Sequence, residues 1–206
     1  MDPFRTQVER YERWFEDHRT LYRSELRLVR ALFPAAGRGL EVGVGTGRFA
    51  APLGIGVGVE PSPAMAARAQ ARGVLAVLGR GEALPFLDGT FARVLIVVAL
   101  CFAEDPTRML AEAWRVLAPG GALGVGIVDR DSAWGRHYRA RATDPFYRRA
   151  RFYAAGEVEA WLRGLGPAGL EAGQTLCTPP PGPDAPEWPR AGYGQGGFVF
   201  FVAYRP

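Results

Sequence analysis

The chain has 206 residues, of which 48% are hydrophobic and 22% are charged, a balance typical of a globular domain and not of a disordered chain. Its 25 basic residues against 21 acidic ones give a net charge of +4, and every one of the 25 is arginine. Because the sequence contains neither lysine nor asparagine, it excludes lysine Schiff-base chemistry, a phosphate-loop lysine and any asparagine-dependent site.

Two cysteines, Cys101 and Cys177, and two histidines, His18 and His137, lie far apart in the sequence and match no metal-ligand spacing. We therefore expect no bound metal. The longest apolar run, over 94–103, is about half as long as a membrane span requires. The charged and aromatic N-terminus does not resemble a signal peptide. These features predict a cytoplasmic protein without a membrane span.

Residues 6–33 place aromatic and leucine side chains at helical spacing, which predicts one or two helices and, over 1–36, an N-terminal helical cap. Beyond them, short apolar runs alternate with helical segments over 64–72 and 107–117. The apolar runs, each predicted to be a strand, cover 39–44, 55–59, 74–78, 94–100 and 122–128. This alternation is typical of a parallel α/β sheet with right-handed crossovers.

The C-terminal part resumes the pattern after an interruption. Residues 130–152 are rich in arginine and aromatic residues, and we interpret them as a lid or insert. The remainder predicts a helix over 155–165, a strand over 170–177, a loop rich in proline and glycine over 178–197, and a last strand over 198–204. Since no repeat or second domain is evident, residues 37–206 are expected to form a single globular unit.

The most informative stretch is 40–48, which reads as a strand, a glycine turn and a helix start. In an α/β sheet, this is where a nucleotide-like ligand binds, because glycines allow close approach and a helix N-terminus offers free N–H groups. The spacing is Gly-x-Gly-x-Gly, and Arg48 stands where the dinucleotide fingerprint requires its third glycine. Glu60 closes the second predicted strand, where a carboxylate can accept both hydroxyls of a ribose.

Four sequence blocks occur in order along this region. They are Leu-Glu-Val-Gly-Val-Gly-Thr-Gly-Arg-Phe (40–49), Gly-Val-Gly-Val-Glu-Pro-Ser-Pro-Ala-Met (56–65), Gly-Glu-Ala-Leu-Pro-Phe-Leu-Asp-Gly-Thr-Phe (81–91) and Arg-Val-Leu-Ala-Pro-Gly-Gly-Ala-Leu (115–123). Together they resemble the class I S-adenosylmethionine-dependent methyltransferases, and most closely the branch similar to ubiquinone/menaquinone-biosynthesis C-methyltransferases. The resemblance implies a Rossmann-like α/β fold: a seven-stranded, mostly parallel sheet with an antiparallel last strand and an N-terminal helical cap.

The same resemblance implies S-adenosylmethionine as cofactor, S-adenosylhomocysteine as product, and a set of cofactor contacts. Glu41 would lie near the cofactor's amino group, Glu60 would bind the ribose hydroxyls with Pro61 beside the adenine, and Leu100 and Cys101 would face the sulfonium. The full implied cofactor set is Tyr11, Trp14, Glu41, Gly43, Gly45, Thr46, Gly47, Glu60, Pro61, Met65, Gly81, Glu82, Ala83, Leu100 and Cys101, with Leu84 as an apolar neighbour.

One position departs from the pattern of the family. Many relatives carry an aspartate before the position of Gly81, where it accepts the adenine amino group, but this chain has Arg80 there. That hydrogen bond must then come from Glu82 or from a backbone carbonyl.

No catalytic base is identified from the sequence, and several residues have two readings. Cys101 is either a nucleophile or a small buried apolar residue. His18, beside Asp17, is either a general base on a covering helix or a solvated helix residue. Trp134, His137 and Tyr138 are expected to line the mouth of an acceptor pocket within the insert.

Seven arginines among the aromatic residues of 130–151 allow an anionic acceptor or RNA, but they also fit a solvated lid, and without an RNA-binding motif we do not expect a nucleic-acid partner. The resemblance favours methyl transfer to a small-molecule acceptor. Two alternatives stay open: a non-catalytic S-adenosylmethionine-binding protein acting through partners, and a nicotinamide-dependent oxidoreductase, which Arg48 disfavours. The identity of the acceptor and the oligomeric state are not predicted.

Overall fold

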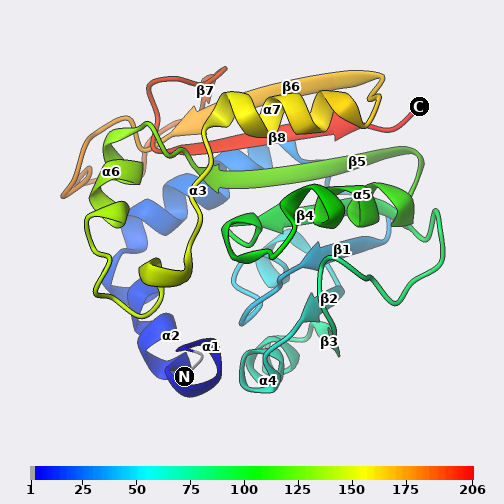
Figure 1. The fold of residues 1–206 in the computed structure, drawn as a ribbon, viewed down its shortest axis with the longest axis horizontal. Coiled ribbons are helices and arrows are strands. Elements are labelled where there is room, and N and C mark those ends of the chain that lie inside the picture. Colours follow the sequence, from blue (N-terminus) through cyan, green and yellow to red (C-terminus); the bar gives the residue numbers. More distant parts are fainter. Residues whose placement is uncertain (1–2) are drawn as a thin grey trace.

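A computed structural model describes residues 3–206, which form one mixed sheet flanked by helices on both faces (Figure 1). The strands, in the spatial order β3-β2-β1-β4-β5-β8-β6-β7, have the following bounds: β1 Gly39–Val42, β2 Val57–Glu60, β3 Leu75–Leu78, β4 Phe91–Val97, β5 Leu117–Val128, β6 Gly169–Thr175, β7 Arg190–Ala191 and β8 Phe198–Tyr204. Strands β3, β2, β1, β4 and β5 are mutually parallel, and β8 runs antiparallel to both β5 and β6.

This topology confirms the predicted α/β class with an antiparallel last strand. The two-residue strand β7, which pairs with β6 at the sheet edge, is an addition to the seven expected strands. Strand β4 ends at Val97, earlier than expected, because Val98 has a φ of 51° and interrupts the extended backbone. Strand β5 begins earlier than expected, at Leu117, with a register shift against β4 before Ala122.

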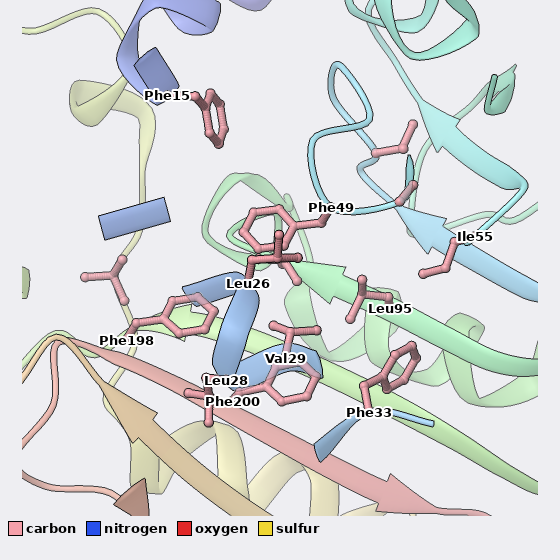
Figure 2. Packing of buried hydrophobic residues seen from close by; sticks show 14 of the residues in the cluster. Phe15, Leu26, Leu28, Val29, Phe33, Phe49, Ile55, Leu95, Phe198 and Phe200 are labelled. Carbon is pink, nitrogen blue, oxygen red and sulfur yellow. The ribbon is translucent and has the colours of Figure 1, made fainter. Parts of the chain in front are cut away.

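Two apolar clusters lie on opposite faces of the sheet. Helices α3 (Arg19–Leu32) and α4 (Pro63–Ala71) pack on one face, and α5 (Pro106–Val116) and α7 (Ala155–Gly164) pack on the other. Figure 2 shows the first cluster, in which Leu26, Leu28 and Val29 of α3 meet Phe198 and Phe200 of β8. Each helix face is apolar at the positions that meet the sheet, and this burial stabilises the arrangement.

Local signals explain where several helices begin. The side chain of Ser62 accepts a hydrogen bond from the backbone N–H of Met65 at 3.4 Å, so it caps α4 as the sequence predicts. Asp105 caps α5 in the same way, and Ser132 caps α6 (Ala133–Arg139). Helices α1 (Pro3–Thr6) and α2 (Val8–Asp17) precede α3. Helix α1 packs against α4, and Glu9 of α2 pairs with Arg68 of α4.

The segment interpreted as a lid or insert differs from the expectation in one respect. Its first part, helix α6, buries Trp134 and Tyr138 in the cluster beneath α3, so this part belongs to the core. The arginines that made the segment look solvated lie on the other side of the helix or beyond it, where Arg136, Arg139 and Arg141 are exposed. Within residues 3–206, no helix combines the length and the apolar character that crossing a membrane requires.

Candidate functional site

The carboxyl ends of the parallel strands meet at one edge of the sheet, and the glycine turn lies at its centre. Gly43, Gly45 and Gly47 all have positive φ angles, of 71°, 55° and 83°. A side chain at Gly43 would collide with Ala99, since an added Cβ would lie 2.5 Å from the Cβ of that alanine. A Cβ at Gly45 would instead lie 3.2 Å from the hydroxyl oxygen of Tyr11, so the second glycine opens toward helix α2.

Glu60, at the end of β2, holds the turn in place. One carboxylate oxygen accepts the N–H of Gly45 at 3.0 Å, and the other accepts the N–H of Ser62 at 2.9 Å. The side chain is 6% exposed. Glu60 therefore ties the glycine turn to the start of α4.

Glu41, inside β1, is a buried carboxyl with an unused oxygen. Glu41 is 2% exposed, and its Oε2 makes no hydrogen bond with any described residue. Burial raises the pKa of this carboxyl well above its usual range, and the charge of Glu60 adds to the effect, whereas a hydrogen bond from the Ala50 N–H opposes it. An unsatisfied buried oxygen is costly unless a ligand provides the missing donor.

Charged side chains fix helix α2 over the turn. Arg48 and Arg72 both donate to the Glu12 carboxylate at 2.5 Å, and Arg48 also reaches Glu16 at 3.1 Å. Burial alone would raise the pKa of Glu12, but hydrogen bonds from the two arginines outweigh it and hold that pKa below its usual range. Arg48 thus occupies the position of a third fingerprint glycine and serves as a link between the turn and α2.

The segment that follows β4 lies beside the turn, and its short 3-10 helix, Leu100–Phe102, carries Leu100 and Cys101. Val98, directly after β4, has a positive φ, a rare conformation for a β-branched residue and one often found at functional sites. Burial raises the pKa of the Cys101 thiol to about 12, so the nucleophile reading of this cysteine is disfavoured. A small apolar cavity opens here, lined by Val98, Cys101, Ile127, Val128, Phe152 and Tyr153.

On the other side of the turn, the predicted adenine-side residues have packing roles of their own. Gly81 is buried against Met109 and Val42, and an added Cβ would lie 2.4 Å from the methyl carbon of Met109. Glu82 accepts the N–H of Glu104 at 2.8 Å and lies 3.6 Å from Arg80, so its carboxylate already has partners. Among the other residues of this set, Met65 is buried, whereas Pro61 and Ala83 are exposed.

Aromatic rings from distant segments cover the turn, and we call Phe4, Tyr11, Phe102 and Phe146 the aromatic cover. The ring centroid of Phe4 lies 4.8 Å from that of Phe102 and 5.2 Å from that of Phe146, with Tyr11 at 6.2 Å from Phe4. Burial, together with the charges of Glu60, Glu41 and Glu12, raises the pKa of Tyr11. The hydroxyl of this tyrosine therefore remains neutral between the turn and the cover.

A second group of rings, which we call the ring trio, comprises Trp134, Tyr138 and Tyr147. The rings of Tyr138 and Tyr147 stack at 4.9 Å, and Trp134 lies 5.7 Å from Tyr138. Trp134 is 3% exposed and its indole N–H donates to the carbonyl of Thr178 at 2.9 Å. The expectation of an open pocket mouth therefore holds for neither Trp134 nor Tyr138, since both are buried.

The two histidines lie near the ring trio. His18 stacks on Trp14 with ring centroids 4.9 Å apart, and its Nδ1 lies 2.9 Å from the carbonyl oxygen of Trp14. The ring of His137 meets that of Trp134 edge to face, with ring centroids 5.8 Å apart. Burial lowers the pKa of His137, as do the positive charges of Arg141 and His18. The structure thus brings His18, Trp14 and His137 to one region, on the α2 side of the site.

Sequence reasoning missed Phe4 and Phe146 of the cover and, in α3, Glu25. Glu25 lies on the buried face of its helix, between Leu21 and Leu28, and is 5% exposed. A charged residue at an apolar position of an amphipathic helix was the signal that could have identified it. For Phe4 and Phe146 no sequence signal existed, because their contacts join segments far apart in the chain.

The chain is similar to known proteins in sequence and in fold. The methyltransferase domain family matches residues 40–125. An uncharacterized protein of Methanocaldococcus jannaschii is 42% identical over 204 residues, covering 98% of both chains. The crystal structure of an S-adenosylmethionine-dependent methyltransferase from Thermotoga maritima, described as a possible histamine N-methyltransferase, is 45% identical, covers 98% of both chains and superposes with a TM-score of 0.94. Malonyl-[acyl-carrier protein] O-methyltransferase of Methylococcus capsulatus is 29% identical over 67% of this chain and 54% of its own length.

Proposed function

Because the chain belongs to the class I S-adenosylmethionine-dependent methyltransferases, we propose that it transfers a methyl group to a small-molecule acceptor enclosed beneath the aromatic cover. The observation that carries the proposal is the cover itself, which joins α1, the end of β4 and residue 146 across the site. Rings that meet over the glycine turn from α1, α2, residue 102 and residue 146 favour a small acceptor over a nucleic acid or protein.

The donor side of the site is assigned to the glycine turn and the two carboxylates beside it. Glu60 would accept the ribose hydroxyls of the cofactor while keeping its two backbone hydrogen bonds. The unpartnered oxygen of Glu41 fits a ligand amino group, which would provide the missing donor. The remaining implied contacts, including Gly47, Thr46, Met65 and Leu100, are retained as part of this proposal.

The chemistry asks little of the protein beyond placement. S-adenosylmethionine, when bound, supplies a methyl group that its sulfonium already activates for in-line displacement. The protein must orient the acceptor and exclude water, and we assign these roles to the aromatic cover. No thiolate takes part, because Cys101 stays protonated. A base is needed only for acceptors that must lose a proton, so a site without an assigned catalytic residue is compatible with the reaction.

The division of labour along the chain forms part of the proposal. Residues 37–206 would bind the cofactor and 1–36 would cap it, with acceptor contacts coming from the cap and from 130–152. Of the two alternatives, the nicotinamide-dependent oxidoreductase is disfavoured by the ion pairs that place Arg48 in the turn. The non-catalytic binder is left to experiment.

The test is methyl transfer from S-adenosylmethionine labelled in its methyl group. The acceptor panel contains amines, phenols, alcohols and carboxylic acids, with tRNA, DNA and protein as macromolecular arms. Histamine is the first amine to include, since the Thermotoga maritima relative is described as a possible histamine N-methyltransferase. We expect label in a small molecule. Label only in a macromolecule would contradict the small-acceptor proposal, and cofactor binding without any transfer would favour the non-catalytic alternative.

A further inference from the structure

Glu25 is a buried charged residue that no part of the donor site uses. It lies at the middle of the buried face of α3 and is 5% exposed. No described residue donates a hydrogen bond to its carboxylate or pairs with it, although the chain carries 25 arginines. Other carboxylates of the covering helices do have arginine partners, as Glu12 has Arg48 and Arg72. A buried carboxyl without a donor is costly to keep unless a ligand supplies one.

A second polar group without a partner faces the same helix. Thr175, at the end of β6, is fully buried and its hydroxyl makes no hydrogen bond. Gly173 lies two residues earlier on the strand, and a Cβ there would lie 2.8 Å from side-chain carbons of both Leu28 and Leu32. Because side chains two residues apart point to the same face of a strand, Thr175 also faces α3. The hydroxyl therefore lies on the α3 side of the sheet, at the edge that carries the site.

The ring trio provides aromatic faces close to Glu25. Burial raises the pKa of Tyr138, and the neighbouring charges that add to the effect include that of Glu25. Leu21 lies one helical turn before Glu25, and both Leu21 and Trp134 border Gly182. A Cβ added at Gly182 would lie 3.0 Å from the side chain of Leu21 and 3.2 Å from that of Trp134. The rings and the carboxyl group thus belong to one buried wall of side chains, built from α3, α6 and residue 147.

The surrounding loop keeps this wall in place. The N–H of Glu187 donates to Ser24 at 2.9 Å, and the Glu187 carboxylate accepts the N–H groups of Cys177 at 2.7 Å and Thr178 at 2.9 Å. Arg27 reaches the carbonyl of Pro186 at 2.9 Å. The loop rich in proline and glycine is therefore fastened to α3 on both sides of Glu25, which is the support that a preorganised binding site requires.

We propose that Glu25 and the ring trio bind a cationic nitrogen of the methyl acceptor, so that the acceptors are small amines. A carboxylate and aromatic faces are the two groups that attract an ammonium ion in a desolvated site. Glu25 and its rings would anchor the acceptor and leave its reacting atom nearer the glycine turn. The inference rests on the proposed methyltransferase function and adds the class of substrate.

Acidic rather than basic side chains are buried near the site, and this favours an amine over an anion as the methyl acceptor. The arginines of 130–151 would suit an anionic acceptor, but six of the seven are exposed to solvent and the other, Arg130, pairs with Asp131 and Glu157. The side chains of Glu25 and Glu41, in contrast, are buried. Oε2 of Glu41 has no hydrogen bond with a described residue, and no charged neighbour or hydrogen bond offsets the burial of the Glu25 carboxyl. Burial raises the pKa of Glu25 to about 8, so the carboxyl keeps its proton at neutral pH unless a bound cation stabilises the charged form.

The experiment is calorimetric titration of the full chain, saturated with S-adenosylhomocysteine, with 2-phenylethylamine. The neutral isostere 2-phenylethanol and the anion 3-phenylpropionate serve as comparison ligands. We expect the amine to bind at least tenfold more tightly than either. Glu25→Gln, which keeps the size of the side chain, should weaken amine binding at least tenfold and leave the alcohol within twofold. Tyr138→Leu, which removes one aromatic face, should weaken amine binding about threefold to tenfold.

Glu171→Gln is the matched control, because it removes the same charge at an exposed position of β6 and should leave all three affinities unchanged. An unchanged affinity for S-adenosylhomocysteine establishes that the Glu25 variant is folded. Failure of the amine to bind, or equal loss in the Glu25 and Glu171 variants, would overturn the inference. Methyl transfer to acids or alcohols but to no amine would overturn it while leaving the proposed function intact, whereas failure to bind S-adenosylhomocysteine would count against the proposed function itself.

Discussion

Glu60 and Glu25 are buried to nearly the same extent, 6% and 5% exposed, but the chain surrounds them differently. Glu60 follows a strand, and each of its oxygens accepts a backbone N–H of the loops that it joins. Glu25 lies within a helix, whose own N–H groups are already used, and no hydrogen bond or opposite charge offsets its burial. The comparison indicates that one carboxylate organises its site before any ligand arrives, while the other depends on a ligand for its partner.

The largest expected effect comes from removing the organised carboxylate. Glu60→Ala should weaken S-adenosylhomocysteine binding by at least a hundredfold, about 3 kcal/mol, because two charge-assisted hydrogen bonds of about 1.5 kcal/mol each are lost. Glu60→Gln retains one acceptor oxygen, so its affinity for S-adenosylhomocysteine should fall less. Cys101→Ala is the control and should stay within twofold, since its thiol offers only contact area. Equal affinities of the Glu60→Ala and Cys101→Ala proteins in calorimetry would refute the ribose assignment.

The unpartnered carboxylate should show itself in the pH dependence of stability. The pKa of Glu25 is about 8 in the folded protein against 4.5 as the ordinary value, so the folded state keeps a proton that the unfolded chain releases. Its contribution to stability is full below about pH 4.5 and declines, by about 1.4 kcal/mol per pH unit, until about pH 8. Glu25→Gln removes this decline.

Denaturant unfolding at pH 5 and pH 7 measures the effect. From pH 5 to pH 7 the free energy of unfolding of the wild-type protein should fall by about 2–3 kcal/mol more than that of Glu25→Gln, whatever the absolute stability of the variant. Parallel pH profiles for the two proteins would mean that Glu25 is ionised in the folded state and already has a partner.

A smaller effect is expected from loosening the helix that covers the donor site. Glu12 joins α2 to the turn through Arg48 and Arg72, and its side chain is 14% exposed. Glu12→Gln should raise the rate of S-adenosylhomocysteine release about fivefold, close to 1 kcal/mol, because α1 and α2 must move for the ligand to leave. Stopped-flow displacement measures the rate. Asp17→Asn, at the exposed end of the same helix, serves as control, and an equal change in both variants would argue against the link.

The donor side was predictable from sequence because its residues are consecutive. A buried strand, a glycine turn and an acid after the next strand are short-range patterns, and β1, the turn and Glu60 at the end of β2 form as those patterns predict. The helix start expected after the turn was wrong, because the chain there forms turns and only a short 3-10 helix over Ala51–Leu53. The acceptor side is assembled from α2, α3, α6 and the loop near residue 182, whose contacts depend on tertiary packing. Sequence periodicity placed Trp14 and Leu21 on helix faces but gave no means of pairing Glu25 with Tyr138.

The same limit explains the altered interpretation of 130–152. Its arginine content suggested a solvated lid, yet helix α6 alternates exposed arginines with buried rings, and only the fold determines which side of a seven-residue helix meets the core. The adenine side remains a prediction, with Glu82 already bound to the N–H of Glu104.

The central claim is that the two carboxylates serve different ligands, and crossed titration tests it most directly. S-adenosylhomocysteine and 2-phenylethylamine are titrated into Glu60→Gln and Glu25→Gln, the amine always at saturating S-adenosylhomocysteine. The account predicts that Glu60→Gln loses affinity for S-adenosylhomocysteine by about tenfold and keeps its affinity for the amine, whereas Glu25→Gln shows the reverse. Comparable losses of both ligands in both variants would contradict it.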